Sequence, residues 1–210
     1  IDRFASTTRT QDLKLAHARL DTTPCPVPRW LPDGHSQTIW AAFVAHNHRI
    51  SFVRERVETP DGDFIDFDWT GPGLIPHRRP DGTALELLPH IADGQTAAAR
   101  WIEPADWHAF PHGQDTPALV LFHGLEGGSK SRYAQAISHY FRARGWIVVV
   151  AHFRGCAGMP NRLARAYFSG DSEEVGFMLN TVRSRLPHAR WHAAGVSLGG
   201  NALLKHLGEQ

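Results

Sequence analysis

Apolar runs alternate with segments of helical periodicity from residue 117 onward, and this alternation constrains the fold more than any other feature of the sequence. The runs are continuous rather than interrupted by polar residues, which is typical of strands that are buried on both faces. Strands of that kind joined by helices form a parallel sheet, so we expect an α/β fold, a mostly parallel sheet with helices on both faces. The expected strands are residues 118–122, 146–150 and 191–196. One expected helix carries Tyr133, Ile137, Tyr140 and Phe141 on one face. A second helix is expected at residues 171–186, with Asp171 and Glu174 as a capping box, and a third at residues 198–207.

The composition is that of an ordinary globular domain. Of 210 residues, 42% are hydrophobic and 20% charged, so a single domain is expected. The 22 Lys and Arg against 21 Asp and Glu give no electrostatic reason to expect nucleic acid as a partner. The apolar run at residues 146–151 is too short to cross a bilayer, and residues 1–4 lack the apolar core of a signal peptide. We therefore expect no integral membrane segment. The oligomeric state has no signature in the sequence.

Cysteine and histidine usage argues against disulfide bonds and a metal site. Two cysteines, Cys25 and Cys156, are too few for a disulfide framework, so we expect free thiols in a reducing compartment, the cytoplasm. The 14 histidines include no H-E-x-x-H motif, and Pro111 stands between His108 and His112, which no helix can then align. We expect structural or solvated histidines and no metal ion.

The first 70 residues are expected to form an arm followed by a hairpin. Residues 1–50 are the arm, with a short helical run at residues 36–46. Residues 51–70 form the hairpin, in which Asp61 and Gly62 make the turn. Its second strand alternates apolar and acidic residues, as a half-buried strand does.

The regular pattern is lost between residues 71 and 116. This stretch is rich in proline and glycine, and it contains one helix candidate at residues 96–102. So long an irregular connection inside a compact domain is typical of a lid or a mobile insertion. Residues 117–210 then form the alternating β/α core.

The pentapeptide Gly195-Val-Ser197-Leu-Gly199 has the form G-x-S-x-G of a nucleophile elbow, a sharp turn between strand and helix that exposes a strained serine. The expected strand before it and the expected helix after it supply the context that the motif requires. Glycine is expected at both flanks because a Cβ there would collide with the neighbouring strand or helix. The plainer alternative is that Ser197 serves as the N-cap of the following helix.

A serine in an elbow attacks a carbonyl carbon, and backbone N–H groups must then stabilise the negative charge on the oxygen. One donor is expected to be the N–H of Leu198, because the start of a helix favours an anion. The other is expected to be the N–H of Leu125, in the loop after the strand at residues 118–122. Gly124, with glycines at 127 and 128, lets this loop bring its backbone against a substrate.

The same loop supports a second interpretation. Residues 124–131 nearly match G-x-x-x-x-G-K-[ST], the phosphate-binding loop of nucleotide hydrolases, but Ser129 stands where the second glycine belongs. The next strand leads to Ala151 and His152 rather than to an acid that would bind magnesium. Nucleotide hydrolysis is therefore the weaker alternative. A third is a non-catalytic binding module that keeps the elbow for packing.

Five motifs occur in the order that one family shows. They are WLPDGHSQTI at residues 30–39, HGLEGGSKSRY at 123–133, HFRGCAGMPNR at 152–162, YFSGD at 167–171 and GVSLGGN at 195–201. Together they resemble the YheT-like α/β-hydrolases, also described as the AB hydrolase 4 family. The resemblance covers most of residues 24–70 and 117–207. It implies a carboxylesterase or lipase-like serine hydrolase of the α/β-hydrolase fold that acts through Ser197 on a small ester or lipid-like substrate and needs no cofactor.

The resemblance also implies what the other site residues do. His123 and His152 are expected to shape loops rather than to act as the catalytic base. Arg154 and Asn161 are expected to fix loops as well, with contact to a bound acyl group as the alternative. Gly124, Gly195 and Gly199 are expected to allow close backbone approach. The connection at residues 71–116 looks longer than the family's usual one, which affects how a substrate would enter.

In α/β-hydrolases the triad runs serine, acid, histidine along the chain. The resemblance therefore implies that the acid and the histidine lie beyond Gln210. On this basis we expect a C-terminally truncated, incomplete domain that is inactive by itself. We also expect the strand before Ser197 to be a bare sheet edge.

Overall fold

The computed structural model describes residues 23–24, 26–44, 48–78, 81, 83, 97–111, 113 and 115–210. Two compact units divide the chain, residues 1–45 and residues 46–210. In the first unit, helix α2 (Gly34–Ile39) continues into a short π-helix, η1 (Trp40–Val44). Asp33 caps α2, since its carboxylate accepts a hydrogen bond from the N–H of Ser36 at 2.9 Å. The helical run expected at residues 36–46 is thus present through Val44, and the rest of it, like Cys25 and His112, lies outside the described residues.

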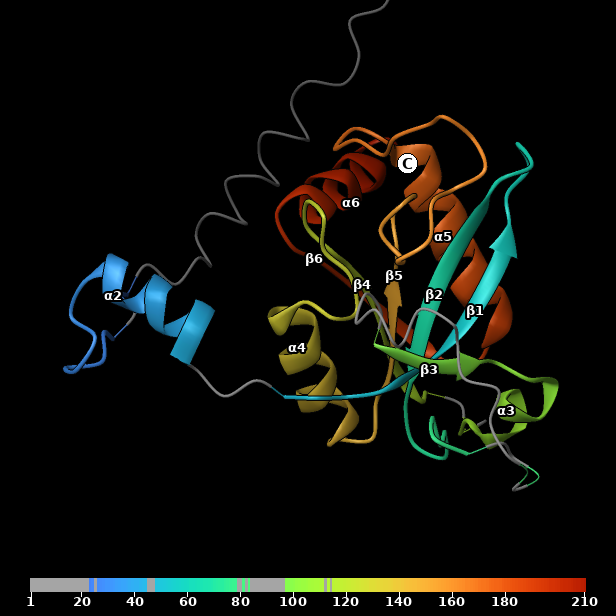
Figure 1. Ribbon diagram of the computed structural model, residues 1–210, viewed down its shortest axis with the longest axis horizontal. Helices are drawn as coiled ribbons and strands as arrows, with labels where there is room; N and C mark the ends of the chain where they lie inside the picture. Colours follow the sequence, from blue (N-terminus) through green and yellow to red (C-terminus); the bar gives the residue numbers. More distant parts are fainter. Residues whose placement is uncertain are drawn as a thin grey trace, which may run out of the picture. The chain divides into compact units, whose positions relative to one another are not determined.

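The second unit is built on a sheet that has six strands within the described residues, in the order β3-β1-β2-β5-β4-β6 (Figure 1). Neighbours are parallel in the pairs β1–β3, β4–β5 and β4–β6, and antiparallel in β1–β2 and β2–β5. The expected mostly parallel sheet is confirmed. The strands are β1 (Phe52–Glu58), β2 (Phe64–Thr70), β3 (Ala98–Trp101), β4 (Pro117–Phe122), β5 (Ile147–Ala151) and β6 (Arg190–Gly195), and the helices of this unit are α3 (Pro104–Ala109), α4 (Arg132–Arg142), α5 (Ser172–Arg185) and α6 (Leu198–Gly208).

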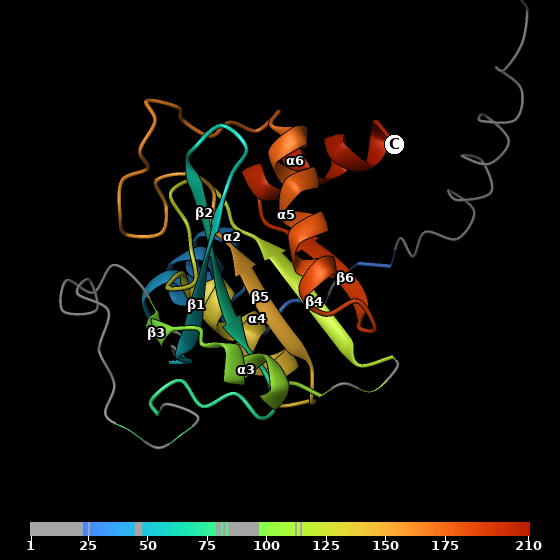
Figure 2. The same cartoon turned by 90° about the vertical axis from the view of Figure 1, so that its right-hand side faces the viewer.

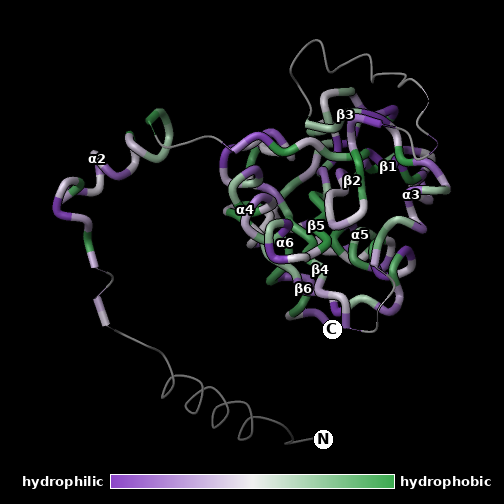
Figure 3. Tube along the Cα trace, turned by 90° about the horizontal axis from the view of Figure 1, so that it is seen from below, coloured by the Kyte–Doolittle hydropathy of each residue, from purple (hydrophilic) through white to green (hydrophobic). Residues whose placement is uncertain are grey.

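Helices cover both faces of the sheet, as expected (Figure 2). Leu121 of β4 belongs to the same buried cluster as Ala134 of α4. Its neighbour Val120 belongs to the cluster that contains Val175 of α5 and Ala202 of α6. Adjacent residues of one strand therefore serve two cores, and β4 and β5 form the hydrophobic centre of the unit (Figure 3).

Helix α4 packs part of its expected apolar face: Tyr133 and Ile137 are partly buried against a core cluster, whereas Tyr140 lies at the surface. Tyr140 is 52% exposed, and its ring lies under the guanidinium of Arg144 at 3.5 Å. The buried residues of α4 are Ala134, Gln135 and Ser138. The small side chains of Ala134 and Ser138 let the helix approach the sheet closely.

The sheet has a topological switch point at β4. From β4 the chain crosses over α4 to β5 on one side, and from β5 it crosses over α5 to β6 on the other side of β4. Ligands of open α/β sheets bind at the carboxyl ends of strands at such a point. Strand β6 has β4 as its neighbour on one side and, within the described part of the chain, an open edge on the other, as expected.

The hairpin of β1 and β2 is present, but the expectation that β2 is half-buried is wrong. Every residue of β2 is buried, the acidic ones included. The reason is charge pairing across the hairpin: the register places Arg54 opposite Asp68 and Arg56 opposite Asp66. Arg56 lies 2.7 Å from Asp66, so the acidic face of β2 is neutralised and can be covered.

The helix candidate at residues 96–102 is also wrong, because Ala98–Trp101 form β3. The alanines favour a helix intrinsically, but the N–H of Phe52 donates to the carbonyl of Ala97 at 3.0 Å and β3 extends the sheet beside β1. Helix α3 follows, with Pro104 at its start and a capping box of Glu103 and Asp106. The role of residues 71–116 as a lid or insertion stays a prediction, since residues 84–96 lie outside the described part.

Asp68 is the centre of the polar contacts beneath the sheet's carboxyl edge. Its carboxylate is fully buried and accepts two hydrogen bonds from Arg54, at 2.7 and 2.8 Å. It also accepts from the hydroxyl of Ser129 and from Nε2 of His152 at 2.9 Å. Burial alone would raise the pKa of Asp68, but the charge of Arg54 and these hydrogen bonds outweigh burial and lower it. Asp68 therefore stays ionised and joins both strands of the hairpin to the loops after β4 and β5.

Replacement of Arg54 by methionine (Arg54→Met) should leave the Asp68 carboxylate buried without its cation. We expect the free energy of unfolding to fall by about 3–5 kcal/mol, the usual cost of breaking one side of a buried ion pair. Denaturant unfolding measures it. The matched control is Arg162→Met, because Arg162 pairs with Glu58 at the surface and its loss should change stability little. Equal effects of the two substitutions would contradict this account of Asp68.

Candidate active site

Ser197 stands between β6 and α6 in the conformation of a nucleophile elbow. Its backbone has φ 52° and ψ −117°, an unfavourable region for a residue with a side chain. The residue is exposed. Ser197 stands at the N-cap position of α6, but its side chain makes no hydrogen bond that caps the helix. The strain is therefore not repaid by capping, and it points the hydroxyl outward.

The flanking glycines are required by close contacts, as expected. A Cβ on Gly195 would lie 2.5 Å from the backbone N of Gly200 in α6. A Cβ on Gly199 would lie 2.5 Å from the carbonyl O of His123 and 2.6 Å from that of Phe122. The start of α6 is thus pressed against the end of β4, which brings the serine to the switch point of the sheet.

Substitution of Gly199 by alanine (Gly199→Ala) should force α6 away from β4. We expect a loss of about 1–3 kcal/mol in the free energy of unfolding, typical of overpacking at a site that cannot relax. The control in the same helix is Gly208→Ala, because a Cβ there meets nothing within 4 Å. Thermal or denaturant unfolding compares the two, and a Gly199→Ala variant as stable as Gly208→Ala would contradict the contact.

The loop after β4 lies against Ser197. A Cβ on Gly124 would be 3.4 Å from the Cβ of Ser197, so glycine lets the backbone come this close. The loop then turns, with the N–H of Gly127 donating to the carbonyl of Gly124 at 2.9 Å. Glu126, the third residue of this turn, has φ 51°, as type II turns require.

The hydrogen bonds of this loop leave one amide open. Four of its N–H groups have acceptors. Gly124 donates to the hydroxyl of Tyr133, and Glu126 donates to the hydroxyl of Tyr167. Gly127 donates to the carbonyl of Gly124, and Gly128 donates to the hydroxyl of Ser131. Within the described residues, the N–H of Leu125 has no acceptor, and the same holds for the N–H of Leu198. These are the two amides that the sequence suggested as oxyanion donors.

His123 orients the open amide. Its Nδ1 donates to the carbonyl of Gly124 at 2.7 Å, and its Nε2 accepts from the N–H of Phe153 at 3.0 Å. The carbonyl of Gly124 and the N–H of Leu125 belong to one planar trans peptide and point in opposite directions. Fixing the carbonyl on the His123 side therefore turns the N–H of Leu125 away from it. Both ring nitrogens are occupied, so His123 has none left to act as the base for Ser197.

The buried imidazole of His123 should titrate far below the ordinary range. Burial and then the charge of His152 lower its pKa to about 4 from 6.5. Between these values the unfolded chain binds a proton that the folded state excludes. This contribution to stability is full above about pH 6.5 and is lost as the pH falls toward 4, by on the order of 3 kcal/mol. NMR titration of the imidazole measures the pKa, and a midpoint above 6 would contradict the assigned hydrogen bonds.

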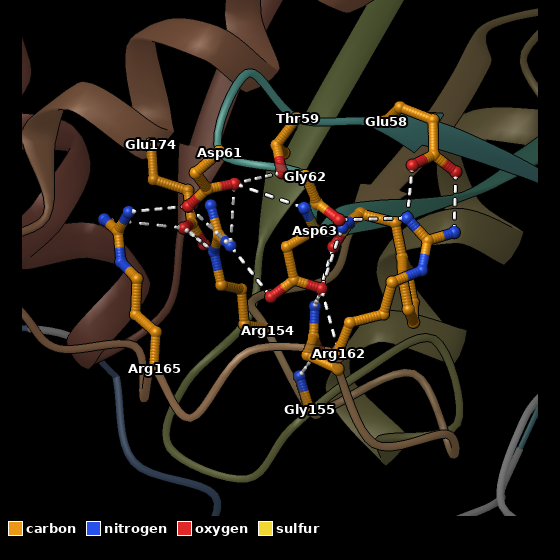
Figure 4. A network of polar contacts seen from close by, with 12 residues as sticks. Glu58, Thr59, Asp61, Gly62, Asp63, Arg154, Gly155, Arg162, Arg165 and Glu174 are labelled. Carbon is orange, nitrogen blue, oxygen red and sulfur yellow. Dashed lines mark hydrogen bonds and ion pairs between the residues drawn. The ribbon is translucent and has the colours of Figure 1, made fainter.

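His152 and Arg154, at the start of the loop after β5, have supporting positions. Nε2 of His152 faces Asp68, as described above. Arg154 forms ion pairs with Asp63 at 2.9 Å and with Glu174 at 2.7 Å (Figure 4). Burial would lower the pKa of Arg154, but Glu174 and the aspartates outweigh it, so the pKa is raised and the guanidinium stays charged.

Asn161 fixes the far part of the same loop. Its amide donates to the carboxylate of Asp63 at 2.9 Å and to the carbonyl of Phe64 at 2.8 Å, and it accepts from the N–H of Gly155. The network in Figure 4 therefore ties the β1–β2 turn to the loop after β5 and to the start of α5. Arg154 and Asn161 thus fix the shape of this loop, and Arg154 also lines the cavity described next.

A cavity of about 870 Å³ opens beside the Leu125 loop. Glu126 and Gly127 line it from one side, and Cys156 and Tyr167 line it from the loop after β5. Its volume is in the range of small-molecule sites.

Sequence reasoning missed the contributions of Tyr133, Tyr167 and Asp68. Both tyrosines stood in motifs that were used for the resemblance, but neither was connected to a particular amide. Asp68 could have been found from the hairpin register, because a turn at Asp61 and Gly62 places it opposite Arg54.

Two properties of the described residues bear on the class of site. None of their helices combines the length and the apolar composition that a membrane span needs. In the same part of the chain, no group of three or more His, Cys, Asp and Glu side chains is placed to hold a metal ion.

The parallel sheet with its switch point, the strained serine between β6 and α6, and the loop facing it define an α/β-hydrolase domain. The chain belongs to the α/β-hydrolase superfamily, as its relatives show. It is 34% identical over 170 residues to YheT of Escherichia coli (strain K12), a match that covers 80% of this chain and 39% of that protein. The resemblance to YheT-like proteins is confirmed.

Other relatives carry names of lipid-cleaving enzymes. The phospholipase ABHD3 of Homo sapiens is 27% identical over 180 residues, 86% of this chain and 36% of that protein. The monoacylglycerol lipase of Saccharomyces cerevisiae is 25% identical over 186 residues, 86% of this chain and 41% of that protein. The chain thus spans less than half the length of these three relatives. No family model matches it.

Proposed function

We propose that this protein is a serine hydrolase that cleaves carboxylic esters through an acyl-enzyme on Ser197. The observation that carries the proposal is the pairing of a strained, exposed serine with two amides that have no acceptor in the described chain. A φ of 52° at Ser197 costs stability and gains no capping bond in return, so the chain keeps it for what the hydroxyl does. When such a hydroxyl attacks a carbonyl carbon, the oxyanion that forms needs N–H donors, and the open N–H groups of Leu125 and Leu198 can supply them.

In the proposed mechanism Ser197 Oγ attacks the ester carbonyl carbon and the alcohol leaves, forming the acyl-enzyme. The N–H groups of Leu125 and Leu198 stabilise the oxyanion of each tetrahedral intermediate. Water then hydrolyses the acyl-enzyme and regenerates the serine. In the proposed mechanism a histidine base takes the proton of the serine hydroxyl and passes it to the leaving alcohol, and an acid orients that histidine.

The proposed substrate is a small ester or a lipid-like ester. Two of the relatives are named as a phospholipase and a monoacylglycerol lipase, and both names refer to esters of fatty acids. We propose that a part of such a molecule away from the reacting ester lies in the cavity beside Glu126 and Tyr167, whose lining does not include Ser197. We propose a reducing compartment such as the cytoplasm, because two cysteines are too few for a disulfide framework.

The structure weakens the nucleotide alternative. A phosphate-binding loop must present several free amides to the phosphates. Here the N–H groups at 126, 127 and 128 are already bound by protein groups, and the hydroxyl of Ser129 is buried against Asp68. Thermal stabilisation by ATP would nevertheless favour this alternative over the hydrolase.

A fluorophosphonate probe on the full-length protein tests the proposal. We expect stoichiometric labelling that Ser197→Ala abolishes, together with a loss of ester hydrolysis on the order of a millionfold in kcat. The control is Ser184→Ala, an exposed serine whose hydroxyl bonds to the carbonyl of Thr181 within α5, which should label normally. A folded full-length protein that does not label would favour the non-catalytic binding module, and labelling retained in Ser197→Ala would place the nucleophile elsewhere.

A further inference from the structure

Two tyrosine hydroxyls occupy the amides on either side of Leu125. Tyr133, at the start of α4, accepts a hydrogen bond from the N–H of Gly124 at 2.9 Å. Tyr167, from the loop after β5, accepts from the N–H of Glu126 at 2.7 Å. The two rings come from different elements and meet the loop at positions one residue before and one residue after the open amide.

Each hydroxyl is fixed by contacts that do not involve the amide it binds. The ring of Tyr167 stacks on Phe153, with centroids 5.5 Å apart and planes 13° apart. The side chain of Tyr133 packs, partly buried, against the cluster that contains Leu121 and Ala134, and its hydroxyl fills the space over Gly127, where a Cβ would lie 2.3 Å from its oxygen. The tyrosines therefore impose their geometry on the loop rather than follow it.

The bond to Glu126 selects one state of the turn. Residues 124–127 can form a type I or a type II turn, and the two differ by rotation of the peptide that joins Leu125 to Glu126. The φ of 51° at Glu126 is that of the type II turn, and residues other than glycine and asparagine adopt a positive φ only at a cost in energy. The hydroxyl of Tyr167 offsets that cost because it binds the N–H of this same peptide.

The bond to Gly124 fixes the peptide that joins His123 to Gly124. That peptide enters the turn beside Ser197, and its N–H would otherwise compete with the N–H of Leu125 for an anion in the site. Occupation of both neighbours leaves Leu125 as the amide free to bind one.

From these contacts we infer that Tyr133 and Tyr167 are positioning residues, which hold the N–H of Leu125 in the direction of the oxyanion. The inference rests on the proposed function. Neither tyrosine is assigned contact with the reacting atoms, and both act through the Gly124–Gly127 turn.

The first test compares Tyr133→Phe and Tyr167→Phe with Tyr140→Phe in the full-length protein. Tyr140 lies in the same helix as Tyr133, and its ring is exposed under Arg144. We expect each of the first two variants to lower kcat roughly tenfold with little change in KM, because a misdirected donor weakens transition-state binding alone. Affinity for a boronic acid, which forms a tetrahedral adduct with the serine, should fall by the same factor, and Tyr140→Phe should change neither quantity.

The outcomes separate the two proposals. Activity that survives Ser197→Ala overturns the proposed function. Activity that Ser197→Ala abolishes, but that both tyrosine variants keep at the level of Tyr140→Phe, overturns the positioning role alone. An increase in KM at constant kcat would also overturn it, because that pattern indicates loss of ordinary substrate contact.

A second measurement needs no variant and holds if a variant fails to fold. In the full-length protein, amide exchange observed by NMR should be slow at Gly124 and Glu126 and fast at Leu125. Addition of the boronic acid should then slow exchange at Leu125 and move its proton resonance downfield. A Leu125 amide that is protected without inhibitor, or unchanged with it, overturns the inference.

Discussion

The buried carboxylate of Asp68 is the interaction on which the arrangement of the site's loops depends. A carboxylate without water is costly unless a cation and hydrogen-bond donors surround it, and here Arg54, Ser129 and His152 do so. Each of these groups comes from a different segment: β1, the loop after β4 and the loop after β5. Loss of any one would leave the others facing an unsatisfied charge. The need to neutralise and hydrogen-bond the buried Asp68 carboxylate therefore holds the three segments together, whether or not a substrate is bound.

Hydrogen bonds connect the groups around Asp68 to the residues of the site. Ser129 ends the loop that contains the open amide of Leu125, and His152 stands next to Phe153, whose N–H binds His123. His123 in turn binds the carbonyl that orients the amide. His123 does this in its neutral form, since Nδ1 must donate while Nε2 accepts. A protonated ring would carry a hydrogen on Nε2 and would lose the bond to the backbone, so burial of this imidazole is part of what keeps the loop in shape.

The elements that local pattern decides were predictable, and those decided by distant contacts were not. The elbow at Ser197, the strands at β4 and β5, and the steric need for Gly195 and Gly199 all follow from a few consecutive residues. Strand β3 does not, because its alanines favour a helix until β1 lies beside them. The burial of the acidic face of β2 is an intermediate case: its arginine partners follow from the hairpin register, but His152, which also binds Asp68, is 84 residues away. The tyrosines that bind the loop amides could be located in motifs, but hydroxyl positions depend on the packing of α4 and of the loop after β5.

The catalytic serine proposed here stands on the least supported strand of the sheet, yet its position does not depend on that strand's free edge. Strand β6 is largely exposed and has β4 as its neighbour on one side. What holds Ser197 is the other side: the N–H of Val196 donates to the carbonyl of Phe122 at 3.0 Å, and Gly199 packs against that same carbonyl. The strained residue is thus clamped between two contacts with the end of β4, the strand whose own loop carries the opposing amide. Because the end of β4 positions both Ser197 and the loop that carries Leu125, the distance between them does not depend on the open edge of β6.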